Sequence, residues 1–514
     1  MGEVRRALLS VSNKEGLADF AKGLYDLGFE LTASEGTASF LRAQRIPVRN
    51  LEEVTGIGSI LGGRVKTLHP KVHAGILAIP TNAQHTKDLA AIGAERFDLV
   101  VVNLYPFEAT VAQGASTEAT IENIDIGGVA LLRSAAKNAE HVAVVSNPRQ
   151  YPDVLDELRR TGDLSRQTRD RLALAAFART SEYDAQITNW WQHVAGYEVT
   201  TEPYLRMALD KAQDLRYGEN PYQKAAFYRN EDDRNLSLAD AEKLHGKELS
   251  FNNLLDFDAA LALAVDFRDP VAVIIKHGNP SGVAVRDRLA EAYAVAYAAD
   301  SKAAYGCVAA FNRTVDLDTV KGMKGHFIEG IIAPDFAPDA LERLRKRENI
   351  RLLRPRGTWE PRPSWHVIHI RGGFLVQTTG APTLAPEELK VVTKARPTDD
   401  QVRDLLFATA VCKHAKSNAV VLAKDRATVA IGAGQVSRVD AVRLAVMKAQ
   451  GHAAGSVLSS DAFFPFRDGI DEAAKAGVAA ILQPGGSIRD PEVVDAANEH
   501  GVPMVFSGVR FFKH

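Results

Sequence analysis

The sequence contains very little cysteine and no long hydrophobic run. Its 514 residues include 2 cysteines, Cys307 and Cys412, which lie far apart and form no CxxC pattern. This spacing excludes a disulfide framework and the usual zinc sites, and it predicts a reduced, cytoplasmic protein. No apolar segment reaches the length of a membrane span, and the first residues enter a strand-like segment without a signal-peptide core.

The sequence also lacks an excess of charge of either sign. Lys plus Arg number 62 and Asp plus Glu number 64, which gives a formal net charge of −2. This balance argues against a protein that coats nucleic acid, so anionic ligands must be held by local clusters of cations. The chain is too long for one hydrophobic core, and we expect two or three domains.

Short apolar runs alternate with helical patterns along the chain, which predicts parallel sheets covered by helices. Buried strands are expected at 7–12, 98–104, 141–146, 271–275, 419–423, 429–432, 478–482 and 502–506. Helices are expected at 17–27 and 171–191, and the second of these closes an N-terminal domain. The polar stretch 196–203 then places a domain boundary near residue 200. The Arg- and Pro-rich segment 344–365 is either an inter-lobe connection or a basic surface.

The run from Gly62 to Gly75 combines glycines, cations and two histidines without any acid. Glycine lets backbone N–H groups approach a ligand, and Arg64 and Lys66 supply positive charge. This composition favours a phosphate or oxyanion site over a solvated basic loop. The strand-to-helix turns 12–14 and 34–37 add further phosphate-binding groups, although simple helix capping explains either turn alone.

Polar residues at other predicted strand ends are candidates for catalysis, because open α/β sheets bind ligands there. Lys276 and His277 form the best catalytic pair, since His accepts protons near neutral pH and Lys stabilises an oxyanion. Asp125 precedes two glycines, as a substrate-facing carboxylate would. Lys137 lies on a helix with few charges, and a lysine in a low-dielectric site can lose its proton; taken alone, a snorkelling surface lysine is the favoured interpretation.

A series of short strings, taken in order, closely resembles the AICAR formyltransferase/IMP cyclohydrolase family of purine biosynthesis. The strings are SVSNK, GGRVKTLHP, NLYPF, IDIGG, LLRSAAKN, RYGENP, KHGNPSG, KSNAV, GAGQ, SDAFFPFRD and RFFKH. The resemblance covers essentially the whole chain and implies an α/β fold. It implies a methylglyoxal-synthase-like doubly wound cyclohydrolase domain at 1–199. It also implies a formyltransferase domain at 200–514, with two cytidine-deaminase-like lobes that meet near 345–370 and lack the deaminase zinc.

The resemblance implies the last two steps of IMP synthesis. A formyl group passes from the co-substrate 10-formyltetrahydrofolate to the 5-amino group of AICAR, and formyl-AICAR then closes to IMP with loss of water. We also expect a homodimer in which Glu329 reaches the partner's site, no transition metal, room for a monovalent cation, and neither nucleic acid nor membrane as a partner. The alternatives are a non-catalytic nucleotide- or RNA-binding protein, which the basic segment 344–356 supports, and an enzyme with only one activity.

The resemblance also assigns residues. For IMP or formyl-AICAR it assigns Ser12, Asn13, Lys14, Ser34, Glu35, Gly36, Thr37, Arg64, Val65, Lys66, Thr67, Asn103, Asp125 and Ile126. The cyclisation is carried by Lys66, Tyr105, Asp125 and Lys137. AICAR is bound by Arg216, Tyr217, His277, Gly306, Glu329, Asn418, Arg438, Phe463 and Arg510, and folate by Val439, Asp468, Ser487 and Ile488.

Within the formyltransferase set, the resemblance makes His277 the general base, Lys276 the transition-state stabiliser and His514 a terminal histidine near the substrate. Tyr222 and Lys513 depart from the family pattern and receive no role. Glu35 stands where a second glycine is common, and its side chain is expected to point away from the phosphate.

Overall fold

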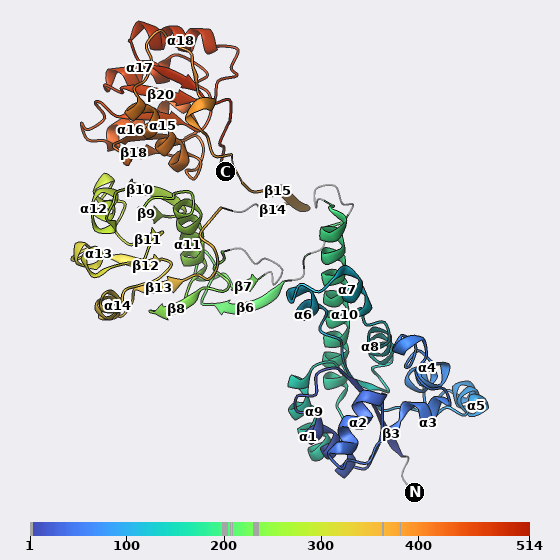
Figure 1. Ribbon diagram of the computed structural model, residues 1–514. Coiled ribbons are helices and arrows are strands. Elements are labelled where there is room, and N and C mark those ends of the chain that lie inside the picture. Colours follow the sequence, from blue (N-terminus) through green and yellow to red (C-terminus); the bar gives the residue numbers. More distant parts are fainter. Residues whose placement is uncertain are drawn as a thin grey trace. The chain divides into compact units, whose positions relative to one another are not determined.

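The structure is a computed structural model that describes residues 4–197, 204–205, 207, 209–229, 236–361, 364–380 and 382–514. The chain divides into two compact units, unit 1 (Met1–Ala208) and unit 2 (Leu209–His514), which Figure 1 shows in blue to green and in green to red. The boundary predicted near residue 200 falls on 198–203, which lie outside the described residues.

Unit 1 contains a five-stranded sheet in the order β3-β2-β1-β4-β5, and every pair in it is parallel. The strands are β1 (Arg5–Val11), β2 (Phe29–Ala33), β3 (Arg49–Asn50), β4 (Leu99–Asn103) and β5 (Ala143–Val145). The strands predicted at 7–12, 98–104 and 141–146 are therefore confirmed. Because the strand order reverses between β1 and β4, the carboxyl ends of these two strands flank the crevice where doubly wound sheets bind ligands.

Helices pack on both faces of this sheet and bury the apolar runs of β1 and β4 almost completely. They are α1 (Leu17–Asp26), α2 (Glu35–Ala43), α3 (Leu51–Thr55), α4 (Pro70–Leu77), α5 (Ala83–Ile92), α6 (Phe107–Ala112), α7 (Thr117–Glu122), α8 (Gly127–Lys137), α9 (Tyr151–Thr161) and α10 (Arg166–Ala195), with the 3₁₀ turns Leu61–Gly63 and Pro148–Gln150. The predicted closing helix corresponds to α10, which begins where the Ser165 side chain accepts the Thr168 N–H.

Unit 2 contains a twelve-stranded sheet in the order β16-β21-β20-β19-β17-β18-β10-β9-β11-β12-β13-β8. The strands are β8 (Glu242–His245), β9 (Val271–Lys276), β10 (Asn279–Val285), β11 (Cys307–Phe311), β12 (Ile328–Ile332), β13 (Arg351–Arg354), β16 (Lys390–Val391), β17 (Val420–Lys424), β18 (Ala427–Gly432), β19 (Val457–Ser460), β20 (Ala480–Gln483) and β21 (Met504–Phe506). The prediction of a parallel sheet is confirmed for β11, β12 and β13 and for β19, β20 and β21. It is wrong at the centre of the sheet, where β9 and β17 each run antiparallel to both neighbours. Two-residue turns after β9 and after β17 reverse the chain, and no crossover helix separates the strands.

The helices of unit 2 cover both faces of its sheet (Figure 1). They are α11 (Phe251–Ala264), α12 (Leu289–Ala299), α13 (Leu317–Gly322), α14 (Pro338–Arg345), α15 (Asp399–Cys412), α16 (Arg438–Lys448), α17 (Asp468–Lys475) and α18 (Asp490–Glu499), with a 3₁₀ turn at Pro386–Glu388. Alternate residues of β9 point to opposite faces of the sheet. Val273 and Ile275 pack into the core beneath α11 and α15, whereas Ala272 and Ile274 pack into the core beneath α12 and α13.

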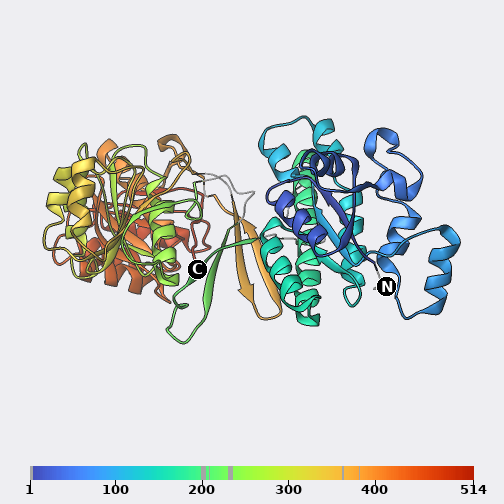
Figure 2. The ribbon, with the colours of Figure 1, turned by 90° about the horizontal axis from the view of Figure 1, so that it is seen from below.

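Two hairpins form separate two-stranded sheets in unit 2 (Figure 2). The first joins β6 (Asp210–Leu215) to β7 (Ala225–Arg229), and the second joins β14 (Trp365–Ile370) to β15 (Gly373–Thr378). Strand β13 lies within the Arg- and Pro-rich segment 344–365 that the sequence left open, and the second hairpin begins at its last residue, Trp365. Within the described parts of the chain, no helix is long and apolar enough to cross a membrane.

Candidate active sites

A cavity of about 660 Å³ lies at the carboxyl ends of β1 and β4 in unit 1. Most of the residues predicted to bind IMP line it: Ser12, Lys14, Ser34, Gly36, Thr37, Arg64, Lys66, Thr67, Asn103, Asp125 and Ile126. Tyr105, predicted to take part in cyclisation, lines it as well, whereas Asn13, Glu35, Val65 and Lys137 are not among the lining residues. The structure thus brings together residues from five separate segments of the sequence at the point that the sheet topology favours.

Asn103 fixes the shape of this site where the two central strands end. Its Oδ1 accepts the backbone N–H groups of Ser12, at 2.5 Å, and Asn13, at 2.9 Å. Its Nδ2 donates to the Asn13 carbonyl at 2.9 Å. A side chain at the end of β4 therefore holds the turn that follows β1, which explains why an asparagine ends a run of valines.

The amino end of α2 forms the anion-binding side of the cavity. The Thr37 hydroxyl bonds both the N–H and the carbonyl of Val11, each at 3.2 Å, and Ser10 Oγ donates to Ser34 Oγ at 3.1 Å. These bonds tie α2 to β1, and free backbone N–H groups at a helix start favour phosphate. Glu35 is exposed and lies outside the lining, as expected for an acid beside an anion site.

Charged groups from several segments also line the cavity. Lys66 Nζ donates to the Tyr105 hydroxyl at 3.1 Å. Burial lowers the pKa of Lys14, and the nearby Lys66 ammonium lowers it further. Burial raises the pKa of Asp125, although hydrogen bonds from the Gly128 and Tyr105 N–H groups and the charge of Lys66 oppose this shift. The cavity therefore combines two ammonium groups for an anion with a carboxyl group suited to proton exchange.

Two acidic or amide residues of this cavity escaped the sequence reasoning. Glu122 forms a two-point ion pair with Arg64, and Asn123 lies beside it in the lining. Both precede the predicted Asp125 by only a few residues, so their position in the IENIDIGG stretch was the available signal.

Three other residues of unit 1 lie apart from the cavity lining. Lys137 is exposed at the last position of α8, ten residues beyond Gly127, which lines the cavity; this separation is about 15 Å along a helix. The histidines of the glycine-rich run have structural partners. His69 Nδ1 accepts the Lys71 N–H at 3.1 Å, and His73 Nδ1 bonds Ser134 Oγ at 3.0 Å.

In unit 2, the predicted residues gather along one edge of the twelve-stranded sheet. This edge is formed by the carboxyl ends of β9, β18, β19, β20 and β21 and by the amino ends of β10, β11, β12 and β17. Sequence reasoning expected site residues at carboxyl ends alone. Gly306 and Glu329 instead stand at amino ends, because β11 and β12 run against β9. Antiparallel pairing thus places both kinds of strand end on one edge.

Lys276 and His277 end β9 at the centre of this edge. Lys276 Nζ donates to the Gly306 carbonyl at 2.7 Å, while His277 is exposed at the tip of the β9–β10 turn. Gly306 has a positive φ of 70°, and a Cβ there would come within 3.0 Å of Lys276 Nζ. Glycine is therefore required both for the backbone conformation and for the close approach of the lysine.

Arg438 is almost completely buried, at 6% exposure, and its guanidinium is bound within the protein. It pairs with Asp461, donates to Ser460 Oγ at 3.1 Å, and donates to Asn418 Oδ1 at 2.5 Å. Arg438 Nε and Asp461 Oδ2 are buried without a hydrogen-bond partner among the described residues. Arg438 therefore orients Asn418 directly, and its predicted contact with AICAR stays a prediction.

The C-terminal residues run beside the 413–418 loop. The Ser417 N–H donates to the Lys513 carbonyl at 2.8 Å, and Lys513 Nζ donates to the His414 carbonyl at 3.2 Å. The Lys416 N–H donates to Asn279 Oδ1 at 2.9 Å, which links this loop to the hairpin that carries His277. Three contacts therefore join the tail, this loop and the hairpin.

The remaining predicted side chains of unit 2 are mostly exposed. Arg216 lies over the Tyr217 ring, at 5.5 Å from its centroid, and Arg510 lies over Phe512, at 4.5 Å. The rings of Phe512 and His514 are 5.6 Å apart. The folate-matched residues Val439, Asp468, Ser487 and Ile488, together with Phe463, lie in or just before α16, α17 and α18. Ile488 is fully exposed, and Tyr222, to which no role was assigned, is 84% exposed.

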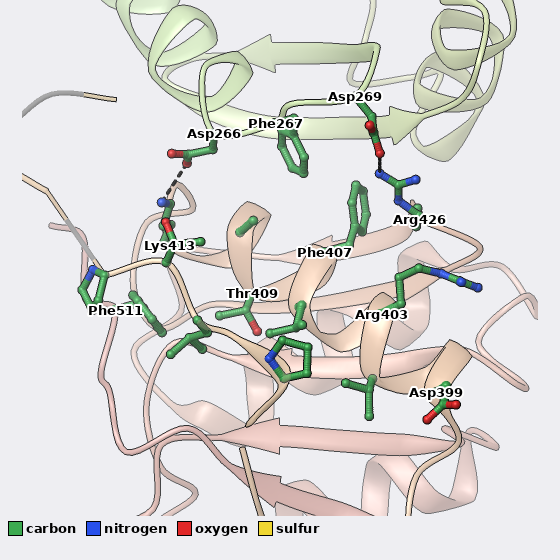
Figure 3. A pocket seen from close by; sticks show the side chains of 17 residues that line it. Asp266, Phe267, Asp269, Asp399, Arg403, Phe407, Thr409, Lys413, Arg426 and Phe511 are labelled. Carbon is green, nitrogen blue, oxygen red and sulfur yellow. Dashed lines mark hydrogen bonds and ion pairs between the residues drawn. The ribbon is translucent and has the colours of Figure 1, made fainter. Parts of the chain in front are cut away.

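A second cavity, of about 680 Å³, lies in unit 2, and none of the predicted site residues lines it. Figure 3 shows the rings of Phe267 and Phe407 facing each other, with Asp266 toward Lys413 and Asp269 toward Arg426. The two rings are 5.6 Å apart, and both acid–base pairs are ion pairs. Four of its charged side chains are therefore paired with one another within the protein.

The basic segment 344–356 favoured an RNA-binding alternative. Several of its cations, however, form bonds within the protein. Arg354 pairs with Glu242 and Asp335, at 2.8 and 3.1 Å. Arg347 donates to the Met323 and His326 carbonyls, and Arg351 lies 3.6 Å from Glu329. These bonds give three of the six cations of this segment structural partners. Across the described ranges, no group of three or more His, Cys, Asp or Glu is placed to hold a metal ion.

Comparisons with known proteins agree along the whole chain. A family model described as "AICARFT/IMPCHase bienzyme" matches residues 135–448, and one described as "MGS-like domain" matches residues 16–130. The "Bifunctional purine biosynthesis protein PurH" of Persephonella marina is 48% identical and covers 99% of this chain and 100% of its own. Proteins of the same name from Desulfitobacterium hafniense and Acidithiobacillus ferrooxidans are also 48% identical, covering 99% and 100% of this chain and 100% of their own. A solved structure described as "Crystal structure of ForH" is 37% identical over 36% of this chain and 98% of its own, with a TM-score of 0.33.

Proposed function

The chain belongs to the AICARFT/IMPCHase bienzyme family, and from this premise we propose that each unit carries one of the two reactions. The chain is a bifunctional enzyme of IMP biosynthesis, with AICAR formyltransferase and IMP cyclohydrolase activities. Unit 1 performs the cyclisation and unit 2 the formyl transfer. The unit 1 cavity, in which residues from five segments meet at the topological switch point, is the observation that carries this division.

In unit 1, the phosphate of formyl-AICAR binds at the amino end of α2, where Thr37 and Lys14 face the cavity. Ring closure requires the carboxamide nitrogen to lose a proton as it attacks the formyl carbon, and the resulting oxygen must be protonated to leave as water. Asp125, whose pKa is raised by burial, and the hydrogen-bonded pair Lys66–Tyr105 supply these proton transfers. Holding both ends of one molecule in reach is a large part of the rate enhancement. A role for Lys137 stays a prediction from the resemblance.

In unit 2, the 5-amino nitrogen of AICAR attacks the formyl carbon of 10-formyltetrahydrofolate, the co-substrate that formyl transfer requires. His277 accepts the proton that the amine loses and returns it to the folate nitrogen as the carbon–nitrogen bond breaks. Lys276, held against the Gly306 carbonyl at 2.7 Å, stabilises the negative charge on the formyl oxygen. The openness of the sheet edge leaves both side chains accessible to two substrates at once.

We further propose that the enzyme works as a homodimer. The β14–β15 hairpin exposes Trp365, Ile368, Ile370, Phe374 and Leu375 by 38% to 60%, although it forms a sheet of only two strands. An isolated two-stranded ribbon is marginally stable in water, and a second copy of the chain is a suitable cover for its apolar side chains. The crossing of Glu329 into the partner's site remains part of this proposal.

Light scattering of the purified protein measures the assembly directly. We expect a dimer for the parent protein, and dissociation when Phe374 and Leu375 are both replaced by Ser. Leu174→Ser, which changes a 72% exposed residue of α10, is the matched control and should leave the mass unchanged. A parent protein that is monomeric at micromolar concentration would contradict the dimer.

The two activities are tested by incubating the protein with AICAR and 10-formyltetrahydrofolate and measuring IMP by chromatography. We expect IMP only when both are present, and IMP from supplied formyl-AICAR without folate. Accumulation of formyl-AICAR without IMP would mean that the unit 1 cavity is inactive. A location in the cytoplasm, where these soluble metabolites are made, is part of the same proposal.

A further inference from the structure

Helix α11 makes side-chain hydrogen bonds to three separate segments that carry predicted formyltransferase residues. Asn252 Nδ2 donates to the Glu219 carbonyl at 3.1 Å, in the loop that follows Arg216 and Tyr217. Asn253 Nδ2 donates to Glu329 Oε2 at 3.0 Å. Asp256 Oδ1 accepts the Gly278 N–H at 2.7 Å, directly beside His277. All three donors and acceptors come from the first two turns of α11, and the resemblance assigns a role to none of them.

The turn beside Asp256 has an unfavourable backbone conformation. Lys276 and Asn279 pair across the β9–β10 hairpin, so His277 and Gly278 are its two central residues. Both have positive φ, 52° for His277 and 71° for Gly278. Glycine adopts this region freely, whereas histidine is strained there and keeps this conformation only where its surroundings enforce it. The bond from Gly278 to Asp256 is one such enforcing contact.

The amino end of α11, which carries Asp256, is itself held in place. Asn253 Oδ1 accepts the Ser250 N–H at 3.1 Å and its hydroxyl at 2.9 Å, which orients the Asn253 amide and caps the helix. Phe257 and Ala260 are fully buried in the core beneath α11. Asp256 therefore extends from a helix start that is both capped and packed.

Asp256 also brings a negative charge to the turn. Lys276 and His277 face it from the β9–β10 turn, Glu329 from β12 and Cys307 from β11. Burial raises the pKa of Asp256, whereas the Gly278 hydrogen bond and the charges of His277 and Lys276 lower it. A carboxylate in this position places a negative charge beside the residues of the turn.

We propose that Asp256 is a positioning residue for formyl transfer, which holds the left-handed turn that presents His277 and sets the charge beside it. Asn253 holds the Glu329 side chain in a similar way, so one face of α11 positions two predicted site residues. This inference rests on the proposed role of His277 in formyl transfer.

The test compares Asp256→Ala with Asp256→Asn in the full-length protein. Ala removes the acceptor and the charge, and we expect kcat for formyl transfer to fall about 100-fold, with KM for AICAR changed less than threefold, as for a misplaced catalytic group. Asn retains an oxygen that can accept the Gly278 N–H, so it should recover most of kcat. Because Asn carries no charge, the acid limb of the kcat/KM profile should move to lower pH.

Asp339→Ala is the matched control, because Asp339 also accepts a backbone N–H, from Ala340 at 2.8 Å, but lies on α14 away from the sheet edge. Cyclisation of supplied formyl-AICAR, measured on every variant, should stay at the parent rate. If Asp256→Ala keeps formyl transfer within twofold of the parent while His277→Ala is inactive, the positioning role is wrong and the proposed function stands. If Asn is as defective as Ala with an unchanged pH profile, the role is merely structural and the inference fails. If His277→Ala retains formyl transfer, the proposed function fails independently.

Discussion

Unit 1 encloses its candidate site within one chain, whereas unit 2 spreads its candidate site along an open sheet edge. In unit 1, parallel strands bring their carboxyl ends to one crevice, and a cavity of about 660 Å³ results. In unit 2, antiparallel neighbours place strand ends of both kinds on one edge, where His277 and Arg510 are exposed. The first arrangement suits one substrate whose two ends must be held together, and the second leaves room for two substrates that react with each other.

The strongest test of this difference between the units removes the proposed general base of unit 2, His277. We expect His277→Ala to lower formyl transfer by at least about 10²–10⁴-fold, because no other proton acceptor stands at the tip of the turn. Cyclisation of supplied formyl-AICAR should continue at the parent rate. Loss of both activities in a folded variant would show that the units are not independent.

The mirror experiment removes Lys66 from unit 1. Lys66→Ala deletes the ammonium that donates to Tyr105 at 3.1 Å and that faces Asp125, so we expect cyclisation to fall about 10²–10³-fold. Formyl-AICAR should then accumulate from AICAR and folate, because unit 2 is unchanged. Single-turnover chromatography of both nucleotides measures this directly, and an unchanged yield of IMP would remove Lys66 from the mechanism.

Stability also separates the units. Arg438→Ala leaves the fully buried Asp461 without its ion-pair partner, and breaking a buried pair in this way typically costs about 3–5 kcal/mol. We expect a calorimetric transition of unit 2 to move to lower temperature while that of unit 1 stays in place. Arg443→Ala, on the same helix but with an exposed and weakly paired side chain, is the control. Equal shifts in both transitions would mean that the units unfold together.

Acidification should weaken unit 2 through His414. Burial lowers the pKa of His414, although the hydrogen bond and charge of Asp266, 2.5 Å away, oppose this shift, so the folded protein binds a proton there less readily. In the unfolded chain His takes a proton below its ordinary pKa of about 6.5, so the unfolded state binds more protons there. The contribution of His414 to the free energy of unfolding is therefore present above that pH and is lost as pH falls below it, by at most about 1.4 kcal/mol per pH unit. His414→Gln should show a flatter dependence of melting temperature between pH 7.5 and 5.5, and an identical slope would refute this origin.

The smallest expected effect concerns the mouth of the unit 1 cavity. Glu122→Gln releases Arg64 from its exposed ion pair, so we expect a KM for formyl-AICAR that is a few-fold lower. The melting temperature should not change, because surface ion pairs contribute little. Glu118→Gln, one turn earlier on α7, is the control. A higher KM for Glu122→Gln would indicate that Glu122 contacts the substrate itself.

The sequence allowed good predictions where local pattern decides the outcome. The valine run of β4 and the polar residue after it were recognisable because buried parallel strands are apolar on both faces and ligands bind at their ends. The antiparallel course of β9 was not recognisable. It depends on a two-residue turn containing His277, which is not a typical turn residue for positive φ.

Partners that are distant in sequence account for the other differences. Arg438 is bound by Asp461 and Asn418, and Asp256 by Gly278, and no local pattern relates these residues. Local sequence pattern also does not show where Lys137 lies. The resemblance places it among the catalytic residues, whereas the geometry of α8 leaves it exposed at the far end of a helix that starts at the cavity.

The bond between Asp125 and Tyr183 sets the smallest fragment in which the cyclohydrolase can be expressed alone. The Asp125 N–H donates to the Tyr183 hydroxyl at 2.8 Å, and Tyr183 is fully buried on α10 with Phe107 at 6.1 Å. A truncation placed after β5, the last strand of the sheet, would keep every strand and still release the Asp125 backbone from its anchor. Fragments intended to separate the two activities therefore have to end beyond α10.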